Sequence, residues 1–457
     1  MPPSSHDAVS ITKPQPADVP VTASTDTSDH FRRYRKVALA ACFGTFIEWY
    51  DFLTFATLAV HFSALFFPAD DPVAGLLYSL ATFGIGMVVR PVGAVIFGSL
   101  GDRHGRRSVF IATIAIMGVA TFAVGLLPTH AQWGWWATGL LVTLRVIQGL
   151  AMGGEIGGAN VYLAEHAPVA QRGAVTSVLQ WMGGLGILAS TFQIVLLQSW
   201  LGDAEFRAWG WRIPFLLSAL LLLASIRARL ALHESPVFTT LHQKQREAKA
   251  PLRECLADRS TRARMALLFF CVSSGGGVLF FCSQVYAPVY LKTVVGMDAV
   301  LAGRLGLIAT LCLFPLTLAC GHLSDRIGRR PVVLSGLLLG ALAMLPVYAG
   351  LSQFADSPAT VVLLLLVIVC AVALVTGPQT ALLSELFPAR TRYTAVGLPH
   401  NLAAGWMGGL SPLMVAFIAN KVGMPLAGLL YPTLLLTIAL LLGWRYLPET
   451  KGADLSQ

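Results

Sequence analysis

Twelve apolar runs of membrane-spanning length constrain this chain more than any other feature of its sequence. A transmembrane helix needs about 20 predominantly apolar residues, and each run offers such a length between charged or Pro/Gly-rich breaks. Soluble domains contain about 25% charged residues, whereas this chain contains 12%. We therefore expect an integral membrane protein without a large extramembrane catalytic domain. The runs lie at about 37–60, 74–97, 108–127, 135–164, 173–199, 211–232, 264–290, 299–321, 331–350, 358–384, 393–420 and 426–447.

The runs predict helices rather than the strands of a membrane barrel. Barrel strands alternate apolar and polar residues over about ten positions, because one face meets lipid and the other meets the lumen. The stretch VVLLLLVIV at 361–369 is apolar on every side. Helices satisfy their own backbone hydrogen bonds inside lipid, so we expect an all-α membrane fold with twelve transmembrane helices.

The distribution of cations predicts the topology, because Lys and Arg are retained on the cytoplasmic side. Basic clusters precede the first and seventh runs and follow the second and eighth, which places both termini in the cytoplasm. One long polar connector splits the runs into two sets of six. We divide the chain into a disordered tail (1–36), a six-helix bundle (37–232), a cytoplasmic linker (233–263), a second six-helix bundle (264–447) and a short cytoplasmic tail (448–457).

The two halves repeat each other. The loop GSLGDRHGRR at 98–107 recurs as GHLSDRIGRR at 321–330, and each position of the second copy lies 223 residues after its counterpart (325 minus 102, for example). A second set agrees, since Glu165, Pro168 and Arg172 recur as Glu385, Pro388 and Arg392, each 220 residues later (385 minus 165). A parallel repeat of six helices is typical of transporters whose halves rock about a site near the midplane of the membrane.

Several strings in the first half resemble one transporter family. They are EWYDF at 48–52, RPVGA at 90–94, R-x-x-Q-G at 145–149 with GGE at 153–155, and WRIPF at 211–215. With the doubled loop, they resemble the metabolite:proton symporter branch of the major facilitator superfamily. The resemblance implies two bundles related by a pseudo-two-fold axis and alternating access in a bacterial inner membrane. It also implies that Asp102 and Asp325, with Arg106 and Arg329 of the same loops, lock the cytoplasmic side closed.

The same resemblance implies a substrate class. Members of this branch import dicarboxylates, tricarboxylates, shikimate-like or aromatic acids, or zwitterionic osmolytes such as proline and betaine. We expect proton symport of an organic acid anion, with the proton as coupling ion and no other cofactor. An osmolyte symporter, a proton-driven exporter and a non-transporting membrane sensor stay open as alternatives. A sensor would need a sizeable cytoplasmic signalling segment, which neither the tails nor the linker is long enough to provide.

Ionisable residues inside the spans predict where protons bind, because charge in the bilayer is costly and usually functional. Glu48 and Asp51 lie three residues apart and share one face of their helix. Two carboxylates so close together in a poorly solvated place resist ionising together, which is what a proton carrier requires. We expect Glu48, Asp51 and, on the fourth run, Glu155 to couple transport to protons. The alternative is that the first two only pair with Arg90 to hold helices together.

A stripe on the fourth run predicts the substrate anchor. Arg145, Gln148 and Glu155 are spaced to share one helix face, and the planar guanidinium of Arg145 suits a carboxylate. The alternative for Arg145 is a structural pair with a carboxylate of the first run. Arg90 is expected to be structural. In the second half, we expect neutral substrate contacts from Tyr286, Gln379 and Asn401, although polar residues in spans often serve only as interhelical hydrogen bonds.

Other functions find no support in the sequence. The G-x-G-x-x-A pattern at 184–189 lies inside an apolar run with no preceding strand, there is no Walker A loop, and no His, Cys or acidic cluster has metal-ligand spacing. No nucleophile has a plausible base partner. The 32 basic residues exceed the 23 acidic residues mainly in loops and tails, which indicates topology rather than nucleic-acid binding. We expect a monomer that binds a small molecule, protons and lipid, and that is not an enzyme.

The topology gives the first testable prediction. In a background lacking the seven native cysteines, a cysteine at Asp70 should react with an impermeant thiol reagent added to intact cells, and one at His242 should react only after the cells are opened. Basic clusters place position 70 outside and position 242 inside. Reversed labelling of the two positions would overturn the topology.

Overall fold

The computed structural model describes residues 43–67, 72–104, 106–230, 251–389 and 391–455, and these contain helices but no strand. The helix at 43–57 continues beyond a turn at Leu58 as α2 (Ala59–Phe66). The first half then contains α3 (Pro72–Val88), α4 (Arg90–His104), α5 (Arg106–Gly125), α6 (His130–Trp133), α7 (Trp135–His166), α8 (Arg172–Ala208) and α9 (Ile213–Leu230). The second half contains α11 (Pro251–Ala257), α12 (Arg259–Leu267), η3 (Leu268–Ser273), α13 (Ser274–Phe281), η4 (Cys282–Tyr286), α14 (Ala287–Thr293), α15 (Ala299–Ile327), α16 (Arg329–Gln353), α17 (Pro358–Glu385), α18 (Arg392–Leu402), η5 (Ala403–Gly409), α19 (Ser411–Val422) and α20 (Leu430–Tyr446).

These helices account for the expected spans. Ten helical segments of the described chain are long and apolar enough to cross a membrane, and Ile111–Gly125 is a shorter apolar helix. The seventh and eleventh spans are each assembled from several pieces joined by the π-helical turns η3, η4 and η5. With the helix at 43–57 and α2, the described helices coincide with all twelve apolar runs of the sequence.

The end of the expected linker is more ordered than its polar composition suggested. The helix α11 lies within 233–263, and α12 begins at Arg259 rather than at 264. Asp258 caps α12 by accepting hydrogen bonds from the backbone N–H groups of Ser260 and Thr261. Hydrogen bonds from Thr261 and then Ser260 hold the pKa of the Asp258 carboxyl well below its usual range. The first tail and residues 231–250 lie outside the described chain.

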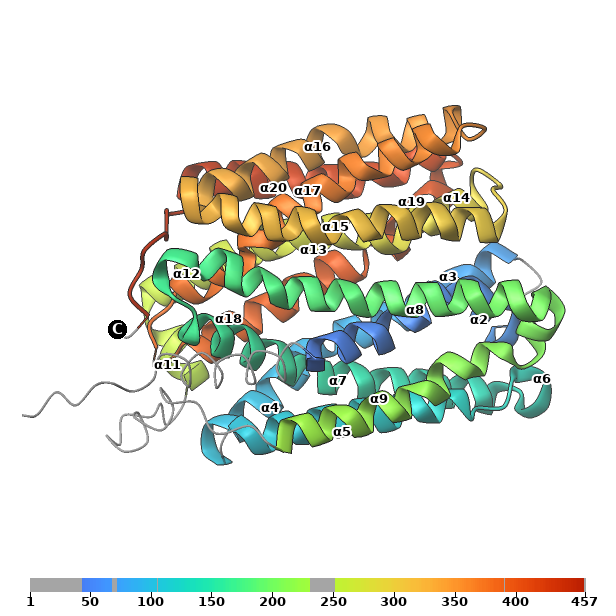
Figure 1. The fold of residues 1–457 in the computed structure, drawn as a ribbon, viewed down its shortest axis with the longest axis horizontal. Coiled ribbons are helices and arrows are strands. Elements are labelled where there is room, and N and C mark those ends of the chain that lie inside the picture. The colour runs from blue at the N-terminus through green and yellow to red at the C-terminus, as the bar shows by residue number, and fades with distance from the viewer. Residues whose placement is uncertain (1–42, 68–71, 105, 231–250, 390, 456–457) are drawn as a thin grey trace, which may run out of the picture.

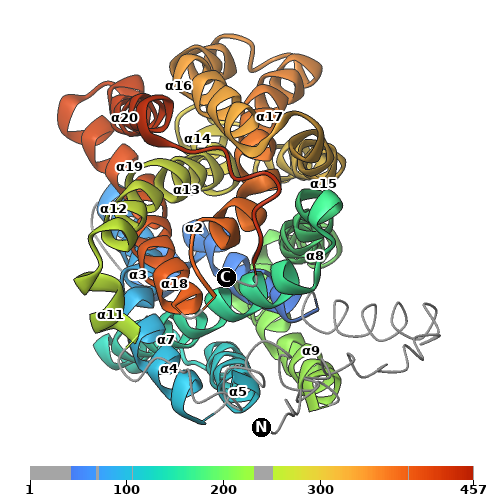
Figure 2. The same ribbon diagram turned by 90° about the vertical axis from the view of Figure 1, so that its left-hand side faces the viewer.

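The helices form two bundles that correspond to the two halves of the sequence. In Figure 1 the helices run nearly parallel along the length of the molecule. In the end-on view of Figure 2 most of the yellow-to-red helices lie above most of the blue-to-green ones, and α18 lies beside α4 and α7. Between the halves, α8 packs against α15 and α17, while α18 and η5 pack against α3, α4 and α7. The fifth span thus meets the eighth, and the eleventh meets the second. The repeat of six helices exchanges these two contacts, as a pseudo-two-fold axis requires.

Glycines bring the second and fourth spans into backbone contact. A Cβ added at Gly149 would lie 1.9 Å from the carbonyl oxygen of Gly86, and one added at Gly153 would lie 1.9 Å from the carbonyl oxygen of Arg90. Only hydrogen fits at these positions, because real Cβ atoms keep more than 3 Å from such neighbours. The approach fixes Arg90 and Arg145, which lie on these two spans, relative to each other.

This contact predicts a stability difference. Gly149→Ala should lower the free energy of unfolding by about 1–3 kcal/mol, because the methyl group pushes two backbones apart. The matched control is Gly139→Ala on the same helix α7, where an added Cβ meets nothing within 4 Å. Thermal unfolding of the purified variants in detergent measures both. Equal midpoints for the two variants would contradict the close approach.

Candidate functional site

A central cavity lies between the two bundles. It is partly open to solvent. Residues of the helix at 43–57, of α8 and of α15 line it, together with residues from the broken seventh and eleventh spans and α17. The polar side chains of the lining are Trp49, Arg90, Gln180, Ser273, Thr317, Thr376, Gln379 and His400.

Arg90 places a permanent charge on this cavity. Its side chain is 1% exposed, and its Nη1 lies 3.4 Å from the Met87 sulfur. Its Nε and Nη2 atoms have no hydrogen-bond partner among the described residues. Glu48, one turn before Phe52 on the helix at 43–57, is the carboxylate whose charge acts on Arg90. Arg90 therefore has donors free for a further anion.

Neutral hydrogen-bonding groups face Arg90 from the second bundle. The His400 Nδ1 lies 3.0 Å from the Ser273 hydroxyl oxygen, and both residues line the cavity. Ser273 ends the π-helical turn η3, and Ala404 in η5 lies on the same wall. Such turns shift the register of side chains within a helix and occur often at functional sites. The second bundle thus offers polar, uncharged contacts to a molecule in the cavity.

A second buried charge pair links the first and fourth spans. Arg145 is 0% exposed, and its guanidinium carbon lies 3.5 Å from the centroid of the Phe55 ring. Its three side-chain nitrogens lack hydrogen-bond partners within the described chain, and so do both carboxylate oxygens of Asp51. The two residues interact electrostatically. The Thr121 hydroxyl near Asp51 donates to the carbonyl of Met117. An acid and a cation that are buried together but not hydrogen-bonded to each other leave room for a proton to bind or leave.

Most of the expected substrate contacts are not part of the lining of the central cavity. Of the five residues expected, which are Arg145, Gln148, Tyr286, Gln379 and Asn401, only Gln379 lines it. Gln148 donates a 2.7 Å hydrogen bond to the Thr121 hydroxyl, and Asn401 donates to the carbonyls of Gly153 and Gly397 at 3.2 and 2.8 Å. Tyr286 packs at a tilt against Tyr290 and Tyr348 inside the second bundle.

Other placements were not expected from the sequence. Arg90, expected to be structural, lines the cavity, as do Trp49 and His400. The EWYDF string was the only sequence signal for Trp49. The side chains of Glu155, Asp102 and Arg106 lie outside the described part of the chain.

One end of the molecule, called here the Asp325 end, is closed by contacts between the bundles. The Asp325 carboxylate accepts hydrogen bonds of 2.9 and 2.8 Å from the backbone N–H groups of Gly173 and Ala174, at the N-terminus of α8. The same carboxylate lies 2.6 Å from Nη1 of Arg329. A helix N-terminus favours negative charge, so the acid of one bundle caps a helix of the other.

Crossed ion pairs add to this closure. Arg172 in the first bundle pairs with Glu385 in the second at 3.0 Å, and Arg392 in the second pairs with Glu165 in the first at 2.9 Å. Both pairs are buried, and Arg329 adds a 3.3 Å contact to Glu385. The sequence showed these residues as a repeat but gave them no role. Their conserved spacing between the halves was the available signal.

The C-terminal segment lies across the same end. Glu449 accepts backbone hydrogen bonds from Arg329 and Arg330 at 2.8 and 3.1 Å, and Arg172 donates to the carbonyl of Ala453 at 2.9 Å. Burial alone would raise the pKa of Glu449, but its backbone hydrogen bonds, that from Arg329 first, hold the pKa below its usual range. Glu449 is thus an anion that caps α16, as Asp325 caps α8.

Two helical bundles related by a repeat, with a polar cavity between them, are typical of membrane transporters. The comparison with family models identifies the family: the model for the Major Facilitator Superfamily matches residues 37–412 and 305–456, so the chain belongs to that superfamily. This confirms the expected fold class.

Curated relatives are transporters. The chain is 34% identical over 442 residues to the inner membrane metabolite transport protein YhjE of Escherichia coli K12, covering 92% of this chain and 98% of that protein. It is 36% identical to the shikimate transporter of the same organism (84% and 87% covered) and 32% identical to the glycine betaine/proline/ectoine/pipecolic acid transporter OusA of Dickeya dadantii (85% and 78% covered). The chain is therefore a multi-pass metabolite transporter and not an enzyme.

A solved structure supports the fold. The proton:xylose symporter XylE bound to 6-bromo-6-deoxy-D-glucose superimposes with a TM-score of 0.74 at 20% identity, covering 93% of this chain and 98% of that one.

The crossed ion pairs predict how the Asp325 end responds to mutation. Glu385→Gln removes the charge that Arg172 and Arg329 share, which leaves the buried Arg172 without its counter-ion and Arg329 with Asp325 alone. We expect this end to open more often. A cysteine placed at Ser177, which is 0% exposed in the closed interface, should then react at least several-fold faster with a thiol reagent. Glu205→Gln, at an exposed acid bonded to Trp209, is the control. Equal rates in both variants would contradict a closing role for the ion pairs.

Proposed function

We propose that this protein is a proton symporter that imports a small organic acid anion across the bacterial cytoplasmic membrane. The observation that supports it most is Arg90, a buried guanidinium on the central cavity with two nitrogens free for a ligand. A planar guanidinium binds a carboxylate through two parallel hydrogen bonds. Gln379 and His400 of the second bundle would hold the rest of the molecule.

Charge balance links the substrate to the proton. Glu48 acts electrostatically on Arg90, so an incoming carboxylate competes with Glu48 for the same cation. If Glu48 takes up a proton as the anion arrives, the net charge of the site stays constant and no extra charge is buried. Anion and proton then cross together, which is symport.

Asp51 with Arg145 provides a second proton position. A proton on Asp51 would leave the buried Arg145 without its counter-charge, so the stability of each conformation would depend on the protonation of Asp51. Glu155 stays a candidate for a further proton site. In this scheme Arg145 tunes the proton site, and Arg90 rather than Arg145 anchors the substrate.

The orientation follows from the cations. The Asp325 end contains Arg172, Arg329 and Arg392, and basic residues are retained on the cytoplasmic side. We assign this end to the cytoplasm, where Asp325 and Arg329 act as a gate, and by the repeat Asp102 and Arg106 act at the equivalent position. With this gate closed, the contacts at the Asp325 end would separate the cavity from the cytoplasm.

A zwitterionic osmolyte is the second candidate. Trp49 lines the cavity, and the face of an indole ring attracts quaternary ammonium groups. The relative OusA transports glycine betaine, proline, ectoine and pipecolic acid by its name. Such a substrate would place its carboxylate on Arg90 and its ammonium over Trp49. Both candidate substrates therefore bind Arg90, and they differ in the net charge of the substrate.

Transport by purified protein in liposomes tests the proposal. Uptake driven by a pH gradient is measured for shikimate, succinate, citrate, benzoate, proline and betaine, and counterflow is measured without the gradient. Asp51→Asn should lose gradient-driven accumulation but retain counterflow, since exchange need not release the proton. Arg90→Lys should raise the half-saturation concentration about tenfold, because an ammonium cannot form the paired contact.

The control for the arginine is Arg445→Lys, at an exposed position on α20. Accumulation of proline or betaine but of none of the acids would favour the osmolyte function. Undiminished accumulation by Asp51→Asn would exclude Asp51 as the coupling site and leave Glu48, with Glu155 examined next.

A further inference from the structure

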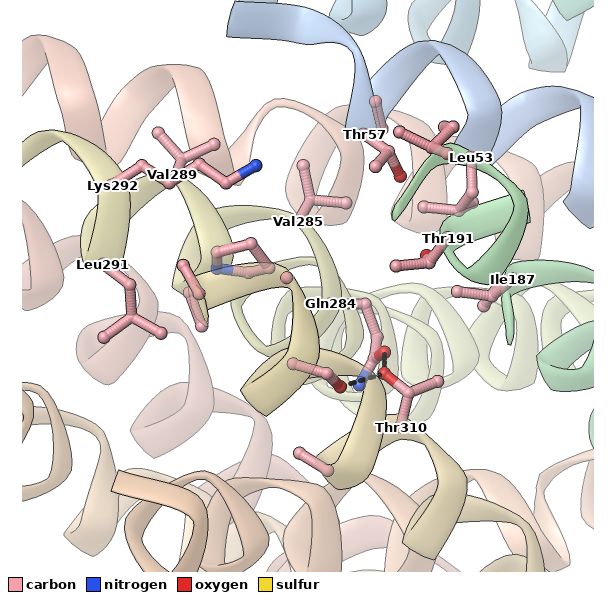
Figure 3. A pocket seen from close by; sticks show the side chains of 18 of the residues that line it. Leu53, Thr57, Ile187, Thr191, Gln284, Val285, Val289, Leu291, Lys292 and Thr310 are labelled. Carbon is pink, nitrogen blue, oxygen red and sulfur yellow. Dashed lines mark hydrogen bonds between the residues drawn. The ribbon is translucent and has the colours of Figure 1, made fainter. Parts of the chain in front are cut away.

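A second cavity lies in the same space between the bundles, toward the end opposite Asp325. It is partly open to solvent. The helix at 43–57, α8, η4, α14 and α15 line it (Figure 3). Ile187 of α8 borders both this outer cavity and the central cavity. The two cavities are therefore adjacent along one path, and a molecule entering from this end meets the outer cavity first.

One charged side chain lines the outer cavity within the described part of the chain. It belongs to Lys292, and most of the other described lining residues are apolar. In Figure 3 the Lys292 side chain extends from the ribbon of α14 toward the side of the cavity that contains Thr57. Apolar walls with one cation suit a small organic anion, whose body is apolar and whose carboxylate needs a counter-charge.

Lys292 has no partner of its own within the described chain. No hydrogen bond or ion pair joins it to another described residue, although Asp298 acts on it electrostatically. Asp298 is occupied, since its carboxylate caps α15 by accepting hydrogen bonds from the N–H groups of Val300 and Leu301 at 3.0 and 2.9 Å. The ammonium thus faces the cavity with its donors free.

Fixed polar groups lie at the far side of this cavity. The Gln284 side chain donates to the Ser283 hydroxyl at 3.0 Å and accepts from the Thr310 hydroxyl at 2.7 Å, as the dashed lines in Figure 3 show. Both ends of the Gln284 amide are therefore held within α15 and η4. They provide neutral polar surface without adding a charge that would compete with Lys292.

We propose that the outer cavity is a second, low-affinity site that binds the carboxylate of an organic acid through Lys292 before the acid reaches Arg90. The inference rests on the proposed function for the identity of the transported anion. A cation in a low-dielectric cleft raises the local concentration of anions and the rate at which they associate. The outer site therefore selects for negative charge, and the central site for shape.

Protection from thiol labelling tests the site without requiring transport. In a background lacking the seven native cysteines, a cysteine at Thr57, on the cavity wall, is labelled in membranes with and without benzoate or benzamide. Benzoate should slow labelling several-fold, whereas benzamide, which has the same shape and no charge, should not. Lys292→Gln should abolish the protection by benzoate, and Lys292→Arg should retain it.

Two controls separate this site from others. Lys421→Gln removes an exposed cation near the end of α19, at the same end of the molecule, and should leave protection intact. Arg90→Lys should also leave it intact, which excludes an indirect effect from the central cavity. Equal protection by benzoate and benzamide, or full protection in Lys292→Gln, would show that Lys292 only reaches toward solvent and would overturn the inference. Protection by benzoate in a protein that accumulates no acid would instead overturn the proposed function and leave the anion site standing.

Discussion

The need to neutralise charge inside a nearly apolar bundle is the constraint on which the rest of the structure depends. At the Asp325 end, the buried charges form direct ion pairs across the two bundles, Arg172 with Glu385 and Arg392 with Glu165. In the centre, Arg90 and Arg145 have opposite charges nearby but retain unpartnered nitrogens. Removing one member of a buried pair is costly. Direct ion pairs therefore stabilise the closure, while the central arginines keep the hydrogen-bond donors that the proposed substrate and proton sites require.

The closure also requires glycine at two facing positions. A Cβ added at Gly173 would lie 2.6 Å from Nη1 of Arg329 and 2.7 Å from the carbonyl oxygen of Gly321. The N-terminus of α8 can approach Asp325 only because both facing positions are glycine. Gly321 opens the repeated loop, so the same sequence element provides the acid that caps the helix and the space that admits it. Rocking of the bundles would break these contacts together, which makes the closure cooperative.

Much of the fold was predictable from the sequence, because helical spans and an internal repeat are local patterns. The run at 358–384 forms α17. The repeat with its 223-residue offset corresponds to the symmetry that relates the two inter-bundle contacts. The roles of Arg90 and Arg145 were not predictable in the same way. Periodicity tells which residues share a helix face, but not which neighbouring element that face meets. The close approach at Gly149 and the π-helical turn ending at Ser273 decide that, and both depend on tertiary packing. Asn401 shows the same limit, since its amide joins α18 to α7 rather than facing the central cavity.

The central claim is that the two ends of the space between the bundles open in alternation. Distances between spin labels measure this directly in liposomes. One pair is placed at Val169 and Leu323 at the Asp325 end, and another at Asp203 and Thr293 at the Lys292 end; all four positions are exposed. On adding substrate at acidic pH, the account predicts that the population of long distances grows for the first pair and shrinks for the second. Distances that lengthen or shorten together at both ends, or that ignore substrate and pH, would contradict it.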